Sequence, residues 1–264
     1  MTDPVDLGRA LGADDDVEQA VDDASDRGRM TFLEHLDELR RRIIYSLYAF
    51  LAAFAVTLYY WKELWIFLTT YFGRMGGQLV MTKPMAGFMF SMKLSALAAI
   101  LVASPFVFTQ LWLFVAPGLY AKEKRVVIPF VLFSSLLFFS GAVFAHLAGF
   151  PAMWGFFASY DALGGVKFFP TLDDTFAFYV KAILGLGLAF QLPMLVYFLA
   201  RFGMVTWKFL VKQFRYAVLI IVIVAAVVTP SGDPITLMVF SVPMLVLYVI
   251  SIGVAWMFGK PKKA

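Results

Sequence analysis

The sequence predicts an all-α integral membrane protein with six transmembrane helices and both termini in the cytoplasm. Hydrophobic residues make up 61% of the 264 residues and charged residues only 15%, against about 25% charged in an ordinary soluble domain. Six long stretches carry no charge, and the basic residues between them divide unevenly between two sides. A chain with so few charges cannot cover a soluble globule with polar groups, which excludes most soluble enzymes and disordered chains.

The charge-free stretches define the six spans. A charge inside hydrocarbon costs at least ~2.5 kcal/mol, and a spanning helix needs roughly 20 apolar residues. The uncharged stretches are Ile43–Trp61, Leu94–Ala121, Val126–Tyr160, Ala182–Ala200, Tyr216–Gly232 and Pro234–Gly259. The spans predicted from them cover about residues 43–61, 93–116, 129–150, 174–200, 215–229 and 235–257.

A six-helix domain is therefore expected over residues 31–258, between two tails. Residues 1–30 hold nine acidic residues and lack the apolar segment of a secretory signal, so we expect a disordered acidic tail in the cytoplasm. Residues 259–264 form a short basic tail. Of the 22 Lys and Arg residues, 16 fall on the side of both tails and 6 on the other. The positive-inside rule places that first side in the cytoplasm.

An amphipathic segment leads into the first span. Thr31 and Glu34 have the spacing of a capping box, and apolar residues recur after them at helical spacing. The opposite face carries the charged residues Glu34, Asp37, Glu38, Arg41 and Arg42. Spacing alone favours an anchor at the membrane interface, stabilised by ion pairs one helical turn apart such as Glu38–Arg42.

The turn after the second span is short and charged. Pro117-Gly118 is expected to end the second helix. Glu123 follows, and it is the only acidic residue between Glu63 and Asp161. Because three basic residues surround Glu123, a local salt bridge is the simplest interpretation.

The third charge-free stretch has 35 residues, too few for two spans and a turn. One helix is therefore expected, between Pro129 and Pro151. The loop before the second span is expected to hold a short helix, Lys62–Tyr71. The fourth span is expected to begin at a cap formed by Thr171 and Asp174.

The last two spans are expected to form a short hairpin. Only 14 residues separate Arg215 from Pro230, which is ~21 Å of helix against a hydrocarbon thickness of ~30 Å. Pro243 is expected to kink the sixth helix.

Few polar groups lie inside the spans. Gln110 and Gln191 are of the kind that most often forms hydrogen bonds between helices. Pro193 removes a backbone donor near Gln191 and leaves a carbonyl free, which also allows a functional polar patch there. His146 is the remaining polar residue of interest.

Sequence signatures of enzymes are absent. The chain contains no GxSxG, HExxH or phosphate-binding loop motif, no cysteine, and two histidines. We therefore expect neither an enzyme nor a metal or cofactor site. A secondary transporter of small solutes or ions stays open as the alternative, although such a protein is expected to carry ionisable residues within its spans.

One set of motifs resembles a known family. The segment His35-Leu-Asp-Glu38-Leu-Arg40-Arg41-Arg42, placed before the first span, resembles the opening motif of the TatC family, the core receptor of the twin-arginine translocase. Further matches follow in the family's order, so that the resemblance covers about residues 31–258. They are Ser104-Pro105, Gln110, Trp112, Phe114, Pro117-Gly-Leu-Tyr120, Glu123, Phe190-Gln191-Leu-Pro193 and Thr229-Pro-Ser-Gly-Asp233.

The resemblance implies a cupped, glove-shaped bundle with short helices 5 and 6 in the bacterial cytoplasmic (inner) membrane. It also implies a receptor that binds the twin-arginine signal peptides of folded precursor proteins at its cytoplasmic face. Such a receptor recruits single-span subunits of the TatA and TatB type, and transport is driven by the proton-motive force. The implied partners are these peptides and subunits, other copies of the chain and the lipid bilayer, but no nucleic acid.

The resemblance also assigns residues. Glu38 and Glu123 are expected to bind the two arginines of the signal, because carboxylates hold guanidinium groups well, with Arg40 orienting Glu38 and Phe114 supporting the pocket. Gln191 stands where many members have a buried Glu, and Gln cannot titrate. The residues expected in a groove for a partner helix or the signal peptide are Gln191, Pro193, Gln110 and Asp233. Those expected to have structural roles are Pro105, Pro117, Leu119 and Tyr120.

Overall fold

The computed structural model describes residues 32–76, 79–115, 124–160, 168–229 and 233–259, and these residues are almost entirely helical. Loops and turns join the helices, and one isolated bridge pairs Val80 with Thr171. The helices are α2 Phe32–Tyr59, α3 Trp61–Arg74, α4 Ala86–Val115, α5 Lys124–Phe144, the π-helix η1 Ala145–Gly149, α6 Phe150–Ser159, α7 Leu172–Ala189, α8 Leu192–Arg201, α9 Trp207–Lys212, α10 Phe214–Val228 and α11 Pro234–Phe258.

Five helical stretches in the described part of the chain are long and apolar enough to cross a membrane. They coincide with the predicted spans 1, 2, 3, 4 and 6 and are Glu34–Tyr59, Ala86–Phe114, Ile128–Ser159, Leu172–Arg201 and Pro234–Phe258. The predicted fifth span corresponds to α10, which is apolar but has only 15 residues. The protein is therefore an α-helical membrane protein, and the count of six spans stays a prediction.

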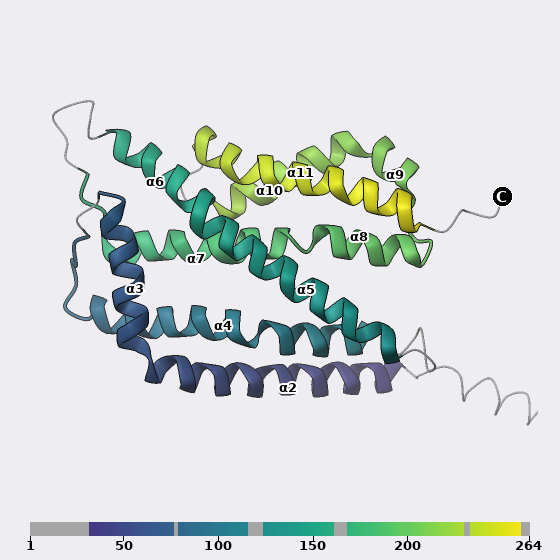
Figure 1. Ribbon diagram of the computed structural model, residues 1–264, viewed down its shortest axis with the longest axis horizontal. Coiled ribbons are helices and arrows are strands. Elements are labelled where there is room, and N and C mark those ends of the chain that lie inside the picture. The colour runs from purple at the N-terminus through teal and green to yellow at the C-terminus, as the bar shows by residue number, and fades with distance from the viewer. Residues whose placement is uncertain (1–31, 77–78, 116–123, 161–167, 230–232, 260–264) are drawn as a thin grey trace, which may run out of the picture.

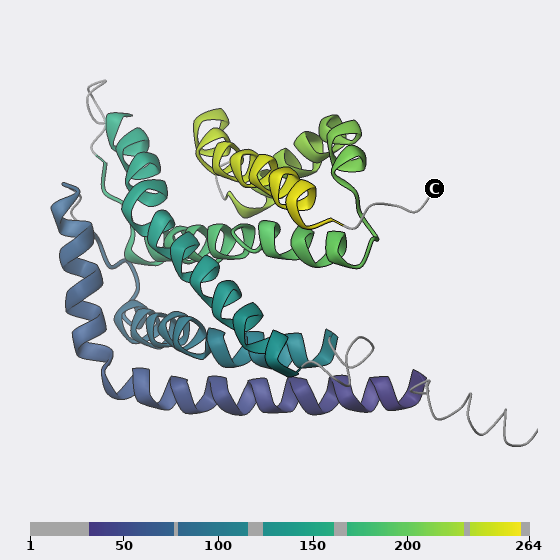
Figure 2. The same ribbon diagram turned by 45° about the vertical axis from the view of Figure 1, so that its right-hand side comes forward.

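The long helices run side by side (Figure 1). Helix α2 packs along α4. Helix α5 crosses the bundle diagonally (Figure 1). Helix α7 packs on α5, and α8 packs on α11. Helix α3 turns away from α2 and stands across one end of the bundle (Figure 2). The start of α2 and the end of α11 both lie at the opposite end from α3. The two ends of the described chain therefore lie at the same end of the bundle.

Small residues and hydroxyl groups bring α2 and α4 together. Ala53 of α2 packs on Ala99 and Ala103 of α4, which lets the two backbones approach closely. Near the α3 end, the hydroxyl of Thr57 donates to the carbonyl of Ser95 at 2.9 Å. A hydrogen bond of this kind satisfies a polar side chain that would otherwise be unpaired in an apolar environment.

The aromatic part of the main core lies toward the α3 end. Fully buried rings from four helices meet there, with centroids 5.3 Å apart for Phe72 and Phe150 and 4.9 Å apart for Phe90 and Phe176. Helix α3 supplies Leu68 and Phe72 to this core. The short helix predicted at Lys62–Tyr71 is thus confirmed and is longer than expected, because its buried face extends to Phe72.

The third predicted helix differs from expectation at its C-terminal end. It was expected to end near Pro151 but continues through η1 and α6 to Ser159. In η1 the ladder widens to hydrogen bonds between residues five apart, as from the Phe150 N–H to the Ala145 carbonyl. Pro151 then lies in the first turn of α6, where its missing N–H costs little.

The fourth predicted span is interrupted in the middle. Helix α7 ends at Ala189 and α8 begins at Leu192, with a turn at Phe190–Gln191. Pro193 explains the break, because it cannot donate to the carbonyl one turn earlier. The cap predicted for this span is confirmed, since the Thr171 hydroxyl accepts from the Asp174 N–H at 3.1 Å.

Candidate functional site

A polar cluster joins α2 to α4 at the end of the bundle away from α3. Arg42 of α2 donates from Nη2 to Oε1 of Glu38 at 3.1 Å, and from Nη1 to Oε1 of Gln110 at 3.1 Å. Gln110 lies near the end of α4 and is buried. One guanidinium therefore ties a carboxylate on its own helix to an amide on the neighbouring helix.

The cluster is half-buried and incompletely paired. The side chain of Arg42 is 25% exposed and that of Glu38 is 16% exposed. Oε2 of Glu38 and Nε of Arg42 are both buried and have no hydrogen-bond partner among the residues that the structure describes. A buried carboxylate oxygen that accepts no hydrogen bond costs free energy. A donor that reaches Oε2 therefore stabilises the protein more here than it would at an exposed acid.

Arg42 pairs with Glu38 in the structure, whereas Arg40 was expected to orient it. Arg40 is exposed. Arg41 pairs with Asp37 at 3.6 Å, and these two side chains are 66% and 63% exposed. The ion pair predicted between Glu38 and Arg42 is thus confirmed, and the same helix carries an exposed pair of the same type for comparison.

Two rings lie at the same end of α2 and α4. His35 stacks on Phe114 with ring centroids 4.5 Å apart. Helical spacing places His35 one turn before Glu38, and Phe114 lies one turn after Gln110. An aromatic surface beside a carboxylate suits a guanidinium. This group stacks on rings and also donates two parallel hydrogen bonds to a carboxylate.

Four predicted residues lie outside the described part of the chain. They are Pro117, Leu119, Tyr120 and Glu123, all within residues 116–123. Pro105, by contrast, lies within α4, which continues through it. The hydroxyl of Thr109 donates to the Pro105 carbonyl at 2.8 Å.

Gln191 lies in the turn between α7 and α8. Its amide Nε2 donates to the carbonyl of Ser134 on α5 at 2.8 Å. The hydroxyl of the same serine accepts from the indole of Trp112 on α4 at 2.8 Å. Ser134 is fully buried and thus links three helices, a connection that nothing in the sequence distinguishes from the other serines.

Pro193 lines an apolar groove of about 450 Å³ between α5, α8 and α11. Its walls include Phe133, Tyr197 and Phe258, but Gln191 is not among the lining residues. The polar patch considered for this region is therefore an apolar groove next to a polar turn.

The two other residues expected in the groove have local partners. Gln110 accepts from Arg42. Asp233 caps α11, because its Oδ1 accepts from the Thr236 N–H at 2.7 Å.

A second polar cluster lies near the α3 end, around His146, and the two tyrosines that join it there were not predicted from the sequence. Nδ1 of His146 lies 2.9 Å from the hydroxyl of Tyr179, and the hydroxyl of Tyr71 donates to the His146 backbone carbonyl. The Tyr71 and His146 rings stack with centroids 4.0 Å apart. Because η1 holds His146 between α3 and α7, the cluster joins three elements and acts as a structural support.

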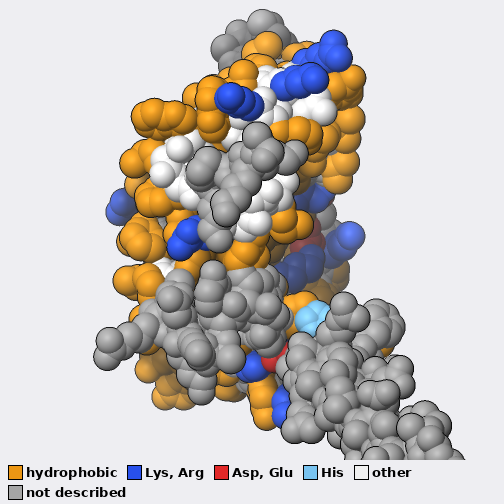
Figure 3. All heavy atoms as spheres, turned by 90° about the vertical axis from the view of Figure 1, so that its right-hand side faces the viewer, with side chains coloured by type: hydrophobic (Ala, Val, Ile, Leu, Met, Phe, Trp, Pro, Cys, Tyr) orange, Lys and Arg blue, Asp and Glu red, His pale blue; other side chains and the backbone are white. Residues whose placement is uncertain are grey.

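The end of the bundle with Glu38 carries basic side chains scattered over an apolar surface (Figure 3). Within the described residues, no three His, Cys, Asp or Glu side chains are grouped so that they would hold a metal ion. The fold and the site thus define a polytopic α-helical membrane protein whose polar cluster lies at the rim of its bundle.

Comparison with known proteins identifies the family. The sequence profile of the Sec-independent protein translocase protein (TatC) family matches residues 34–243. TatC proteins of Koribacter versatilis and Helicobacter pylori are 38% and 39% identical over 86% and 87% of this chain, which match 86% and 90% of those proteins. The chloroplast TATC protein of Arabidopsis thaliana is 36% identical over 88% of this chain and 67% of its own length.

The fold agrees with this relationship. A crystal structure of the twin-arginine translocase receptor TatC superposes with a TM-score of 0.75 at 31% sequence identity, covering 84% of this chain and 98% of that one. The chain belongs to the TatC family of membrane proteins. The family consists of protein translocase components, so the chain belongs to protein transport and not to a family of enzymes.

Proposed function

We propose that the chain is the receptor core of a twin-arginine translocase in the bacterial cytoplasmic membrane. It binds the twin-arginine signal peptides of folded precursor proteins at its cytoplasmic face. In this proposal residues 31–258 form one domain of six spans, and both tails, 1–30 and 259–264, lie in the cytoplasm. Transport is driven by the proton-motive force, and no catalytic step is assigned to the chain.

The half-buried carboxylate of Glu38 is the observation that supports this function best. Oε1 accepts from Arg42, while Oε2 has no partner within the described part of the chain. A guanidinium of the signal peptide supplies donors for Oε2 and stacks beside the His35–Phe114 pair. The free energy of binding this guanidinium is favourable because the site is partly desolvated. Charge-assisted hydrogen bonds are stronger in such a site than in water.

Glu123 is the second carboxylate of the proposal, to receive the other arginine. Its assignment depends on its place in the family's motif, since it lies outside the described residues. Arg42 takes the orienting role expected of Arg40, and Phe114 supports the ring surface.

The groove at Pro193 is proposed to take an apolar helix, either from a single-span TatA- or TatB-type subunit or from the signal peptide. Its walls are apolar and aromatic, and helices in a membrane associate through close packing of such surfaces. Gln191, at the edge of this region, is proposed to hydrogen-bond the incoming helix with its remaining amide capacity. The complex also includes other copies of the chain.

A peptide-binding measurement on the full chain in detergent tests the proposal. Glu38→Gln is expected to weaken binding of a twin-arginine signal peptide about 10- to 100-fold, the effect of losing a charge-assisted hydrogen bond of ~1.5–3 kcal/mol. Asp37→Asn is the matched control, because Asp37 is the neighbouring acid and is largely exposed. Binding should change less than about twofold in that variant.

Two results would contradict the proposal. The first is equal binding by the wild type, Glu38→Gln and Glu123→Gln proteins. The second is uptake of a small solute or ion by the reconstituted chain without any peptide, which would support the transporter instead. The nearly uncharged spans do not favour that second outcome.

A further inference from the structure

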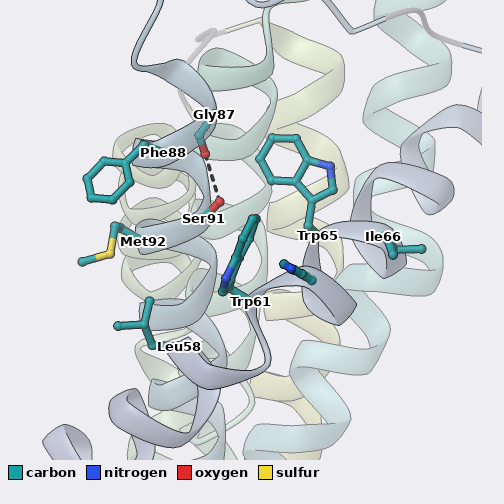
Figure 4. A pocket seen from close by; sticks show the side chains of 9 residues that line it. Leu58, Trp61, Trp65, Ile66, Gly87, Phe88, Ser91 and Met92 are labelled. Carbon is teal, nitrogen blue, oxygen red and sulfur yellow. Dashed lines mark hydrogen bonds between the residues drawn. The ribbon is translucent and has the colours of Figure 1, made fainter.

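A groove of about 780 Å³ lies at the α3 end of the bundle, where the end of α2, the start of α3 and the start of α4 meet. Figure 4 shows Trp61 and Trp65 of α3 on the same side of α4 as Gly87 and Ser91, whereas the ring of Phe88 points away from the two indoles. Its lining is apolar apart from Lys62 and Ser91. It lies at the end of the bundle opposite to Glu38, and none of the described residues that line it is acidic.

The groove opens toward the surroundings of the bundle. Ile66 and Phe88 on its walls are 64% and 60% exposed, and α2 buries little of its surface against the rest of the chain. In a membrane such a surface faces lipid. An empty groove would deprive its lining atoms of dispersion contacts, so a flexible apolar chain that enters it is favoured over a void.

The two indoles place the groove near the boundary between hydrocarbon and headgroups. Tryptophan prefers this level, because its ring is apolar and its N–H is polar. Trp65 is fixed by an edge-to-face contact with the buried Phe90, with centroids 4.8 Å apart. The groove is thus held in shape on the Trp65 side, and it lies at the membrane depth where an acyl chain joins its headgroup.

The charge at this groove is positive. Nζ of Lys62 lies 5.8 Å from the centroid of the Trp61 ring, and the neighbouring acid Glu63 is not part of the lining. The hydroxyl of Ser91 donates its hydrogen bond to the Gly87 carbonyl at 3.0 Å, so this proton is not available to a ligand in the groove. A lysine ammonium is a compact point charge that suits a phosphate group.

We propose that this groove is a binding site for one anionic phospholipid. An acyl chain lies between the two indoles, and the phosphate pairs with Lys62. This lipid site is separate from the proposed signal-peptide site. Its proposal therefore does not depend on the function of Glu38.

Photo-crosslinking in bilayers tests this site. The full chain is reconstituted in phosphatidylcholine vesicles that contain a trace of photoactivatable phosphatidylglycerol or, in parallel, photoactivatable phosphatidylcholine. Adducts are mapped by mass spectrometry. We expect adducts on the peptides containing Trp61–Ile66 and Gly87–Met92, with about a fivefold preference for phosphatidylglycerol, the size that one lysine gives near an anionic lipid.

Two substitutions separate the headgroup from the acyl chain. Lys62→Gln should lower labelling by phosphatidylglycerol more than labelling by phosphatidylcholine, whose choline cation offsets its phosphate, and should thereby remove the preference. Gly87→Leu should lower labelling by both lipids, because its Cβ would lie 3.6 Å from the Trp65 ring and the rest of the side chain would fill the groove. Lys208→Gln is the matched control, since Lys208 lies 5.7 Å from the Trp207 ring in the same Trp-Lys arrangement on α9, at the other end.

Three outcomes would overturn the site. They are equal labelling by the two lipids in the wild-type protein, an equal effect of Lys62→Gln and Lys208→Gln on the preference, and an absence of adducts on both groove peptides. The last result would mean that something other than lipid covers the groove.

Discussion

Replacing Arg42 with Gln is expected to lower the stability of the protein and to tighten its binding of the signal peptide. In the structure Arg42 bonds Glu38 and Gln110 at 3.1 Å each and so couples α2 to α4. Its loss removes a charge-assisted hydrogen bond, worth ~1.5–3 kcal/mol, and a half-buried ion pair. We expect a loss of about 2 kcal/mol in unfolding free energy, discounted for the partial exposure of the pair.

Binding should change in the opposite direction. Two guanidinium groups that share one carboxylate lie roughly 7 Å apart and repel each other by ~2 kcal/mol at an effective dielectric constant of ~20. Without Arg42 the signal's arginine binds both oxygens of Glu38 and meets no such repulsion. Part of the gain is lost because Glu38 becomes less ordered, so we expect binding to tighten about tenfold.

Thermal unfolding in detergent and titration with a labelled twin-arginine peptide measure the two effects. Arg41→Gln is the matched control, since it removes the same charge one residue away from an exposed pair. It should cost less than about 0.5 kcal/mol and leave peptide binding within twofold. If Arg42→Gln weakens both stability and binding, Arg42 only positions Glu38, and the reasoning about competition is refuted.

Two further substitutions test the packing. Gly141→Val should destabilise the protein by about 1–3 kcal/mol, measured by thermal unfolding, because a Cβ there would lie 2.7 Å from the Leu186 carbonyl and 2.9 Å from the Gly187 Cα; unchanged stability would mean that α5 and α7 are not so close. Gln191→Leu should cost about 1 kcal/mol through the lost bond to Ser134 and reduce crosslinking to partner subunits, whereas intact crosslinking and export would leave Gln191 with a packing role alone.

The helices were predictable because a membrane imposes a simple rule on the sequence. Charges are excluded from hydrocarbon, so the gaps between them mark the helices, and the predicted and observed boundaries agree best where charges or caps stand at the ends, as at Asp233 for α11. The rule fails where a helix continues past a proline that was expected to end it. Pro151 was taken as an end, but the π-helix before it changes the hydrogen-bond register, which no pattern of polarity reports.

The sequence predicted the pairing within α2, but it did not predict the contacts of this cluster with the neighbouring helix. Helical spacing identified Glu38 and Arg42 as a pair, since only the geometry of one helix is involved. The role expected of Arg40 stays a prediction, although Arg42, and not Arg40, is on the face of α2 that meets α4. Contacts between helices, such as Arg42 with Gln110 or Gln191 with Ser134, depend on packing angles that a single sequence does not encode locally.

The break in the fourth span has a mechanical consequence. A continuous helix transmits a displacement along its axis, whereas a helix interrupted at Phe190–Gln191 bends there at low elastic cost. Helix α7 packs mainly on α5, but α8 packs mainly on α11. The two halves therefore have different main partners, and we expect a displacement of α8 by an incoming helix to bend the chain at this turn more than it moves α7.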